Sequence, residues 1–429
     1  MGQKRRILFA AIPLSGHLNP QLDLARYLDP DHYEIYFLST RHAAGKFEDK
    51  DYTFISILDQ RYEEISALLE VSTDPTIEQT YFRLYNTVSQ LLPILIAAYQ
   101  AMTIEIKQLQ PDLVVTDFST LFGSFACESA GVPYMTSNPS IGIVESTNQW
   151  EDAPYFLGGW KPAQSLWGRI KNRLGWLFLS WVKRSIFLFH PRVKETPMRI
   201  YRTDETEAYY SNRMMLMLGL EELEFNRYLP TYLRYIGPCI SPSTSVQRMD
   251  LPDKYEKRVL VTFGTLLDGR QDQHLDQIKV LAQAYPTYLF ILTDGKVECQ
   301  GDAPTYEADN IMRYGYLSYS ENFDQFDFVI HHGGAGILHE CLKHAIPSLV
   351  LPVMWDQFDQ VARLEAAGAS LWLKKGEAIL DRFTQLQTMD RTRLKQLQAA
   401  LKGYDTAQLF NEAIDELLGG SMDDTRNRN

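Results

Sequence analysis

Short apolar runs alternate with amphipathic stretches along most of the chain. In the first half, β-rich apolar runs occupy residues 6–12, 33–38, 52–57, 112–116 and 132–136. Helical spacing of apolar residues appears between them, at residues 21–28, 76–109 and 121–130. Residues 13–20 hold two prolines and a glycine and are predicted as a loop. Strands that alternate with helices predict a doubly wound parallel sheet.

The second half repeats this alternation. Its predicted strands are residues 258–263, 287–292, 328–330, 348–351 and 370–373, with helices between them. Residues 237–245 are rich in turn formers and separate the halves. We therefore predict an α/β protein with two domains that face one cleft, residues 1–237 and 258–418, joined by a linker at 238–257. The polar residues 419–429 are predicted to be a disordered tail.

Composition narrows the function classes. A chain of 429 residues can bury two cores, and a net charge of −12 argues against a general nucleic-acid binder. The four cysteines form no CxxC pair, which predicts reduced thiols in a cytoplasmic protein rather than a disulfide frame or a zinc site. The basic start resembles a signal peptide, but the apolar run after it ends at Pro13, so it predicts a first strand.

Residues 328–342 carry the strongest local signal for a binding site. A short apolar strand there runs into Gly333, Gly334 and Gly336, and a helical pattern follows. Such a turn aims free N–H groups and the positive end of a helix at one point, which suits a phosphate. His332 could add a donor, and Glu340 could accept from a sugar hydroxyl. When only the residues of the turn are considered, an ordinary βα turn with a histidine in the core explains them as well as a phosphate site does.

The next predicted strand ends in a polar pair. Residues 349–353 are apolar, and Asp356 and Gln357 follow them. Because ligands of open α/β sheets bind outside the carboxyl ends of the strands, both side chains are expected at the same crevice.

These residues together resemble the signature of the UDP-glycosyltransferase superfamily, whose members use nucleotide sugars. The matching positions are His332, Gly333, Gly334, Gly336, Glu340, Asp356 and Gln357. The resemblance implies the GT-B fold, in which two Rossmann-type domains face a cleft. It also implies that the histidine and the helix end hold the diphosphate, the glutamate holds the ribose, and the Asp-Gln pair holds the sugar.

The sequence departs from the family pattern at two places. Ile337 stands where the family usually has Ser or Thr, and Ile337→Thr is expected to tighten donor binding with little loss of stability. Residues 263–265 resemble the second donor loop, with Thr265 as a donor contact, and Tyr316 lies where an aromatic ring stacks on the base. Residues 317–319 read Leu-Ser-Tyr instead of the Val-Pro-Gln type, so UDP is the default nucleotide.

His17 and Asp117 are the candidate catalytic residues of the first half. Each follows a predicted strand, so both are expected on one rim of the sheet, where a carboxylate can orient an imidazole. The residues alone favour a loop histidine and a helix-capping aspartate. The resemblance points the other way, because Gly16-His17 with Pro20 matches the family motif whose histidine is the general base. It implies inversion at the anomeric carbon without a metal, a cofactor or a covalent intermediate.

Residues 155–192 are rich in aromatic and basic residues, with no acid from 161 to 192. Aromatics at helical spacing are usually core, so we expect Trp160, Trp167 and Phe178 to line an apolar acceptor pocket. The alternative is an amphipathic helix on an anionic membrane, which would make the protein peripheral to the membrane.

The leading hypothesis is an inverting glycosyltransferase that moves a hexose, by default glucose, from a UDP-sugar to a hydroxyl of a lipophilic small molecule. A nucleotide-sugar epimerase and a non-catalytic binding protein on the same fold are the alternatives. The expected partners are the nucleotide-sugar donor and the acceptor, without nucleic acid, and the expected state is a monomer or weak dimer.

Overall fold

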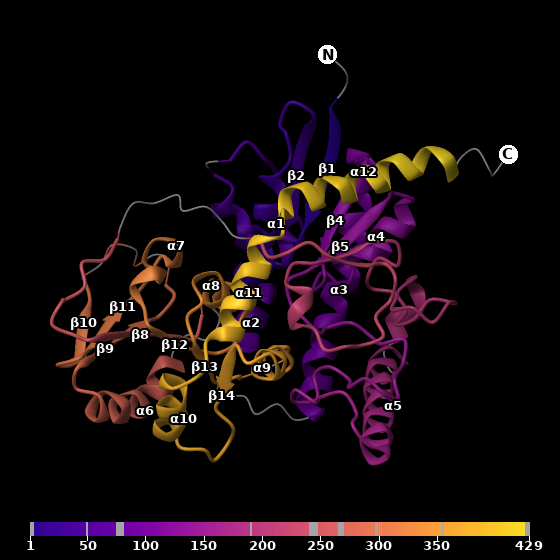
Figure 1. The fold of residues 1–429 in the computed structure, drawn as a ribbon. Helices are drawn as coiled ribbons and strands as arrows, with labels where there is room; N and C mark the ends of the chain where they lie inside the picture. The colour runs from indigo at the N-terminus through magenta and orange to yellow at the C-terminus, as the bar shows by residue number, and fades with distance from the viewer. Residues whose placement is uncertain are drawn as a thin grey trace.

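The protein is described by a computed structural model that covers residues 4–48, 50–73, 81–188, 191–239, 248–264, 270–296, 299, 301, 303–353 and 355–424. Within these residues the chain forms two seven-stranded sheets with helices on their faces (Figure 1). The strands of the first sheet are β1 (Arg5–Ala10), β2 (Tyr33–Ser39), β3 (Thr53–Ser56), β4 (Leu113–Asp117), β5 (Tyr134–Asn138), β6 (Met215–Met217) and β7 (Leu233–Tyr235). Those of the second sheet are β8 (Lys257–Thr262), β9 (Tyr288–Thr293), β10 (Thr305–Ala308), β11 (Ile311–Tyr314), β12 (Phe328–His331), β13 (Ser348–Val350) and β14 (Ser370–Trp372).

The helices connect and cover these strands. The α-helices are α1 (Ser15–Ala25), α2 (Tyr62–Thr73), α3 (Tyr81–Leu109), α4 (Gly123–Ala130), α5 (Leu166–Leu188), α6 (Arg270–Ala284), α7 (Tyr319–Asn322), α8 (Ala335–His344), α9 (Gln357–Ala366), α10 (Ile379–Gln387), α11 (Thr392–Lys402) and α12 (Thr406–Asp424). Short 3₁₀ turns are η1 (Arg41–Lys46), η2 (Asp59–Arg61), η3 (Pro191–Glu195), η4 (Glu221–Leu223) and η6 (Phe323–Gln325).

Both sheets are doubly wound. The first has the order β3-β2-β1-β4-β5-β6-β7 and is parallel throughout. The second has the order β10-β11-β9-β8-β12-β13-β14 and is parallel except for β10, which pairs antiparallel at one edge. The direction of winding reverses between β1 and β4 in the first sheet and between β8 and β12 in the second. The predicted fold class is confirmed.

The central strands are continuous apolar runs because helices cover both faces of each sheet. Residues 7–10 of β1 and all of β4 are buried, as are residues 259–262 of β8 and all of β12. The edge strand β10 is mostly exposed, which fits its alternating polar sequence.

The last helix returns to the first sheet. In α12, four apolar residues pack into the same cluster as Ile7 and Phe9 of β1; they are Phe410, Ala413, Ile414 and Leu418. Figure 1 shows α12 in yellow crossing beside β1 and β2. The prediction of a disordered tail from 419 is wrong as far as Asp424, and residues 425–429 lie outside the described part. The predicted domain boundaries stay a prediction, but the range 258–418 includes a helix that packs on the first sheet.

Two further elements differ from expectation. Residues 13–20 are not a loop, because α1 begins at Ser15 and continues through Pro20. Leu18 and Leu22 are buried four residues apart, so the apolar face of the helix starts before the proline. Residues 62–73 form α2, which the apolar pattern did not reveal, and the predicted helix at 76–109 begins at Tyr81 within the described residues.

Helix α9 of the second half is bound to the first half by buried polar contacts. The backbone N–H of Phe156 donates to Asp359 Oδ2 over 2.8 Å, and Arg363 Nε donates to Glu224 Oε1 over 2.7 Å. Burial would raise the pKa of Glu224, but the charges of Arg363 and Arg227 outweigh burial and lower it. These contacts hold the two halves against each other.

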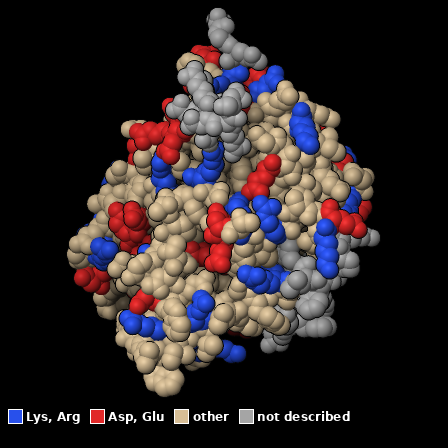
Figure 2. Space-filling view, turned by 90° about the vertical axis from the view of Figure 1, so that its right-hand side faces the viewer, with Lys and Arg blue, Asp and Glu red and all other residues tan. Residues whose placement is uncertain are grey.

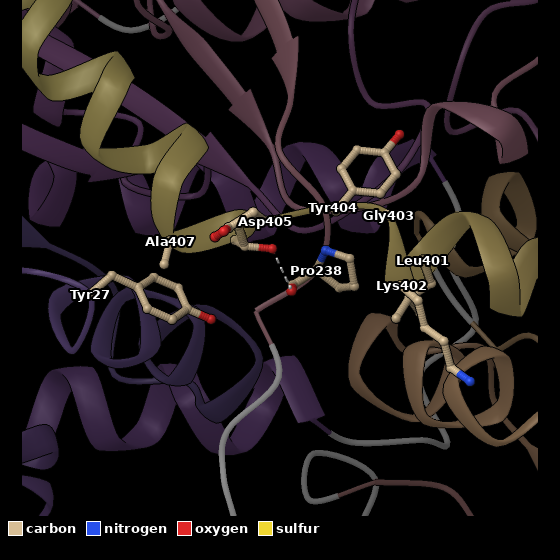
Figure 3. Close-up of a pocket in the computed structure, with 9 residues that line it drawn as sticks. Tyr27, Pro238, Leu401, Lys402, Gly403, Tyr404, Asp405 and Ala407 are labelled. Carbon is tan, nitrogen blue, oxygen red and sulfur yellow. Dashed lines mark hydrogen bonds between the residues drawn. The ribbon is translucent and has the colours of Figure 1, made fainter.

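A hollow of about 420 Å³ lies where the chain crosses between the halves (Figure 3). Residues 401–407, between α11 and α12, line it together with Tyr27 and Pro238. Thr406 Oγ1 donates to the carbonyl of Pro238 there over 3.4 Å. None of the predicted site residues borders this hollow, so we assign it to the crossing of the chain. No described helix combines the length and the apolar character that a membrane span needs.

Candidate active site

His17 and Asp117 meet at the point where the first sheet reverses direction. Asp117 is the last residue of β4, and His17 lies in the first turn of α1, directly after β1. His17 Nδ1 is 3.0 Å from Asp117 Oδ1, and the aspartate side chain is fully buried. Crevices at such switch points are where ligands of doubly wound sheets bind. Proximity of the pair follows from the strand order, although a hundred residues separate them.

The environment of His17 favours a proton on the ring. Burial would lower the pKa of His17, but the charge and hydrogen bond of Asp117 and the charge of Asp356 outweigh burial and raise it above the ordinary 6.5. Asp117 faces Nδ1, so a neutral His17 carries its proton there and leaves Nε2 able to accept one. Nε2 lies 3.5 Å from Ser119 Oγ. Asp117 also accepts from the N–H of Ser119 over 2.9 Å, which fixes the carboxylate.

The glycine turn lies at the corresponding reversal of the second sheet. His331 ends β12, and its Nδ1 accepts a hydrogen bond from the N–H of Gly333 over 3.0 Å. Burial lowers the pKa of His331 to about 3, so the ring is neutral with its proton on Nε2. Gly333 has φ +94°, a conformation that favours glycine. Helix α8 then begins at Ala335, after Gly334 as its N-cap residue.

His332 is held between two glycine turns. A Cβ at Gly264, after β8, would lie 2.8 Å from His332 Cε1, and a Cβ at Gly334 would lie 2.5 Å from His332 Nε2. Both positions must therefore be glycine for the imidazole ring of His332 to fit. Burial lowers the pKa of His332 to about 4, which makes the ring neutral. A neutral imidazole beside the N-terminus of α8 can donate one hydrogen bond to an anion.

The other predicted donor residues are spread around this turn. Glu340 lies on α8, with Oε2 3.5 Å from Lys343 Nζ and 3.5 Å from His344 Nε2. Burial would raise the pKa of Glu340, but the contacts with His344 and Lys343 outweigh burial and lower it, so the group is a carboxylate. Gly336 lies in the first turn of α8 and has open space where a Cβ would stand. Tyr316 is half-buried after β11. Thr265 lies outside the described residues.

Asp356 connects the two halves of the protein. Its Oδ2 accepts from Ser140 Oγ over 2.6 Å and from Gln360 Nε2 over 2.7 Å. Ser140 follows β5 in the first half, whereas Asp356 is the N-cap residue of α9 in the second. Gln357 Oε1 accepts from the N–H of Val353 over 2.8 Å, which orients that side chain. Asp356 therefore faces the half that carries His17.

The two departures from the family pattern place Ile337 and Leu317 in buried positions. Ile337 packs in an apolar cluster with Leu260 and Phe323, under the turn. Leu317 belongs to the same cluster, and Tyr319 exchanges a hydrogen bond of 2.8 Å with Thr262 Oγ1. The expectation that threonine at 337 costs little stability is therefore revised, because its hydroxyl would enter an apolar cluster.

The three aromatic residues predicted for an acceptor pocket have different surroundings. Trp160 is half-buried, with Lys171 Nζ 3.9 Å from its ring centre. Trp167 and Phe178 lie on the outward face of α5, where Trp167 is 79% exposed. Trp176, on the inward face of the same helix, is buried. Lining of an acceptor pocket by the first three stays a prediction.

Four residues of the site were not predicted individually: Ser119, Ser140, Gly264 and Gln360. Ser119, Ser140 and Gly264 all directly follow strands of the sheets. These three residues could therefore have been predicted from the sequence, because residues that directly follow a parallel strand lie at the edge of the sheet where ligands bind. Gln360 gives no comparable signal, because its contact with Asp356 is one turn along a helix. Among the described residues, no group of three or more His, Cys, Asp and Glu side chains is arranged to hold a metal.

Among known proteins, one family model and several proteins named as glycosyltransferases match this chain. The family of erythromycin biosynthesis protein CIII-like C-terminal domains matches residues 304–402. Sterol 3-beta-glucosyltransferase of Saccharomyces cerevisiae is 30% identical over 127 residues, which are 28% of this chain and 10% of the yeast protein. UDP-glucosyltransferase A1 of Starmerella bombicola is 21% identical over 442 residues, covering 96% of this chain and 92% of the relative.

Solved structures match over nearly the whole chain. The glycotransferase of kitacinnamycin superposes with a TM-score of 0.73 at 16% identity, covering 97% of this chain and all of the other. The spinosyn rhamnosyltransferase SpnG, complexed with thymidine diphosphate, superposes with a TM-score of 0.61 at 17% identity, covering 95% and 99%. At these identities the structural matches establish the shared two-domain fold. Together with the family and sequence matches, they support a place for this chain in the UDP-glycosyltransferase superfamily.

Proposed function

We propose that the protein is an inverting glycosyltransferase that moves a hexose, by default glucose, from a UDP-sugar to a hydroxyl of a lipophilic small molecule. One observation carries the proposal: Asp356 of one half is hydrogen-bonded to Ser140 of the half that carries the His17–Asp117 pair, and its charge contributes to the raised pKa of His17. Transfer between two bound substrates needs a general base near the acceptor and a group that holds the donor sugar, and the two halves supply one each.

The reaction is a single displacement. His17 Nε2 takes the proton of the acceptor hydroxyl, whose oxygen attacks the anomeric carbon of the donor. The bond from that carbon to the phosphate oxygen breaks, and the nucleoside diphosphate leaves with the electron pair. Asp117 stabilises the imidazolium that forms. Attack opposite the leaving group inverts the anomeric configuration.

The glycine turn suits the leaving group. Negative charge that develops on the diphosphate is stabilised by the N-terminus of α8, the N–H groups near Gly334 and the neutral ring of His332. Glu340 would accept from the ribose, Tyr316 would stack on the base, and Asp356 with Gln357 would accept from the sugar. Thr265 would complete the second donor loop. We propose no metal or cofactor in this reaction.

The apolar surroundings of His17 support a lipophilic acceptor. The ring of Phe118 lies 5.3 Å from that of His17, and Phe118 belongs to a buried cluster with Ile143, Tyr155 and Trp176. An acceptor that reaches His17 would therefore lie beside the aromatic ring of Phe118. The relatives agree in kind, since one is named for sterol glucosylation. We further propose that transfer takes place in the cytoplasm.

The nucleotide is the least constrained part of the proposal. A structural neighbour was solved with thymidine diphosphate, and the residues after Tyr316 depart from the family pattern. The test is a panel of UDP- and TDP-sugars incubated with pooled lipophilic alcohols, read by mass spectrometry. Transfer from a UDP-hexose with inversion, seen in the anomeric proton coupling of the product, is expected. Transfer only from TDP-sugars would replace the donor assignment.

His17→Ala separates this proposal from its alternatives. Loss of a general base should lower turnover by about 10²–10⁴-fold while the dissociation constant of UDP stays unchanged. An epimerase would change the sugar nucleotide without any acceptor, and a binding protein would show no turnover with any pair. Full turnover by His17→Ala would refute the general-base assignment.

A further inference from the structure

Helix α5 carries a continuous apolar stripe on its outward face. The stripe consists of Leu166, Trp167, Leu174, Leu177, Phe178 and Trp181, each between 47 and 79% exposed. These six are among only fourteen large apolar side chains that are exposed in the described part of the chain, so they form a patch rather than scatter. Exposed apolar patches of this kind on soluble proteins mark interaction sites.

The opposite face of α5 is anchored in one orientation. Trp176 is buried, and its Nε1 donates to the carbonyl of Asp152 over 2.9 Å. Lys183 Nζ lies 2.7 Å from a carboxylate oxygen of Glu145 and 2.7 Å from one of Glu207. Since this lysine and Trp176 are fixed in the body of the domain, α5 cannot rotate to bury its stripe.

The stripe is bordered by cations. Helix α5 contains no acidic residue, although the chain has a net charge of −12. Lys171 and Arg184 flank the stripe on its two sides and contact the rings of Trp160 and Tyr201. Within the described residues no ion pair joins either of them to a carboxylate, whereas Arg169 pairs with Glu151 over 2.8 Å. Their charge is therefore available to an anionic surface.

The position of the helix leaves this face open. Figure 1 shows α5 at the lower right edge of the molecule, beyond the sheets. Figure 2, which looks onto that side, shows a mostly tan lower end with Lys and Arg around it. Trp167 and Trp181 stand fourteen residues apart on the same face, about 21 Å along the helix. A helix with an indole near each end of its stripe can lie flat at a membrane interface, where tryptophan is favoured.

We propose that the outward face of α5 docks the protein on an anionic lipid bilayer. Its apolar stripe enters the boundary between headgroups and acyl chains, while Lys171 and Arg184 contact lipid phosphates. Lipid is favoured over a protein partner because the stripe is convex, rich in tryptophan and flanked by cations on both sides. This inference goes beyond the proposed function and is independent of the donor and the acceptor.

The test is flotation of the purified full-length chain with vesicles of phosphatidylcholine alone or with 30% phosphatidylglycerol, at low and high salt. Wild type is expected to float with the anionic vesicles, and less so at high salt. Trp167→Ser/Trp181→Ser should abolish flotation, whereas Tyr306→Ser, an exposed aromatic on β10, should not alter it. Lys171→Glu/Arg184→Glu should weaken binding by at least about fivefold for each charge. Lys375→Glu/Lys395→Glu gives the same change in net charge away from α5.

Three results would overturn the proposal. The first is wild type that stays with the soluble fraction at every lipid composition. The second is equal loss of flotation in the α5 variants and their matched controls. The third is wild type that forms a dimer by light scattering, does not float, and becomes monomeric in Trp167→Ser/Trp181→Ser, because α5 would then be an interface between copies. Melting temperatures within a few degrees of wild type show that the exposed substitutions leave the fold intact.

Discussion

Ser140 Oγ donates a hydrogen bond of 2.6 Å to Asp356 Oδ2, and this bond joins the two halves of the protein directly. The residues are 216 positions apart in sequence. Asp356 also contributes its charge to the raised pKa of His17. The carboxylate predicted to hold the sugar is thus positioned by the half that carries the candidate base.

Ser140→Ala should weaken binding of the sugar but not of the nucleotide. Loss of one hydrogen bond to a carboxylate is worth about 1.5–3 kcal/mol, or roughly ten- to a hundredfold in the dissociation constant of the UDP-sugar. The dissociation constant of UDP alone should stay unchanged, because the hydroxyl of Ser140 donates to Asp356, the residue predicted to hold the sugar. Calorimetry with both ligands measures this difference.

The matched control is Ser124→Ala, a buried serine of α4 whose Oγ donates to the carbonyl of Ala208 over 2.8 Å. This variant removes a similar hydrogen bond away from the cleft and should leave both dissociation constants unchanged. If Ser140→Ala weakens UDP as much as the UDP-sugar, Asp356 does not bind the sugar.

Asp117→Asn should move the pH dependence of transfer. His17 has a raised pKa in the folded protein, so the rate of wild type should rise with pH through a value above 6.5. Without the Asp117 carboxylate, the effect of burial dominates and lowers the pKa of His17. The acid limb of the kcat/KM profile should therefore shift to lower pH. The rate at its plateau should fall by about 10²–10⁴-fold, because the ring loses its orienting partner.

The control for this variant is Asp112→Asn, near the opposite end of β4, where Asp112 Oδ2 accepts from the N–H of Arg6 over 2.7 Å. Its pH profile should match that of wild type. The His17–Asp117 pair also contributes stability below pH 6.5, and this contribution is lost as the pH rises through the folded pKa of His17. An acid limb that does not move in Asp117→Asn contradicts the pairing.

Because of Asp359, the free energy of unfolding should decrease as the pH rises from acidic to neutral values. Burial raises the pKa of Asp359 to about 7, despite the charge of Arg363 and the hydrogen bond from Phe156. A carboxyl group with a raised folded pKa stabilises the fold below its unfolded value of 3.8, and this stability is lost as the pH rises through about 7.

Asp359→Asn should therefore show a smaller decline in the free energy of unfolding from pH 4 to pH 7 than wild type. Its amide oxygen can still accept from Phe156. Denaturant titrations at a series of pH values measure the difference, with Asp324→Asn as a control, since Asp324 is half-exposed and paired with Arg248. Parallel stability curves for Asp359→Asn and wild type would show that Asp359 is ionised throughout this range.

Ile337→Thr should destabilise the protein more than Ile337→Val. Both variants lose volume from the cluster around Phe323, and Ile→Val typically costs about 0.5–1.5 kcal/mol. Threonine has the shape of valine but adds a hydroxyl, which costs about 1–3 kcal/mol more if it stays without a partner. Thermal unfolding measures both, and donor dissociation constants from the same proteins show whether the hydroxyl reaches the phosphate. Equal stability of the two variants, with tighter donor binding by threonine, would restore the original expectation.

Local patterns in the sequence determined the two sheets and the binding turn. Continuous apolar runs between helical stretches predict buried parallel strands. A strand whose side chains are apolar on both faces is stable only in a sheet that helices cover on both sides. The turn at Gly333 was predictable because the backbone freedom of glycine depends on the residue itself, and the polar residues of the turn lie close to it in the sequence. His17 and Asp117 were expected on one rim because each follows a predicted strand, but their candidate roles came from the family resemblance. The pairing of β1 with β4 in the structure is what brings the two side chains together.

Tertiary structure alone decided the features that depend on contacts between distant segments. The return of α12 to the first sheet depends on apolar residues such as Phe410, whose spacing would fit burial against either half. The bond between Ser140 and Asp356 depends on how the halves meet, which no local pattern encodes. The face of α5 that is buried was likewise undetermined, because aromatic residues lie on both sides of that helix. Its orientation follows from Lys183, which is buried between two glutamates that lie far from it in the sequence.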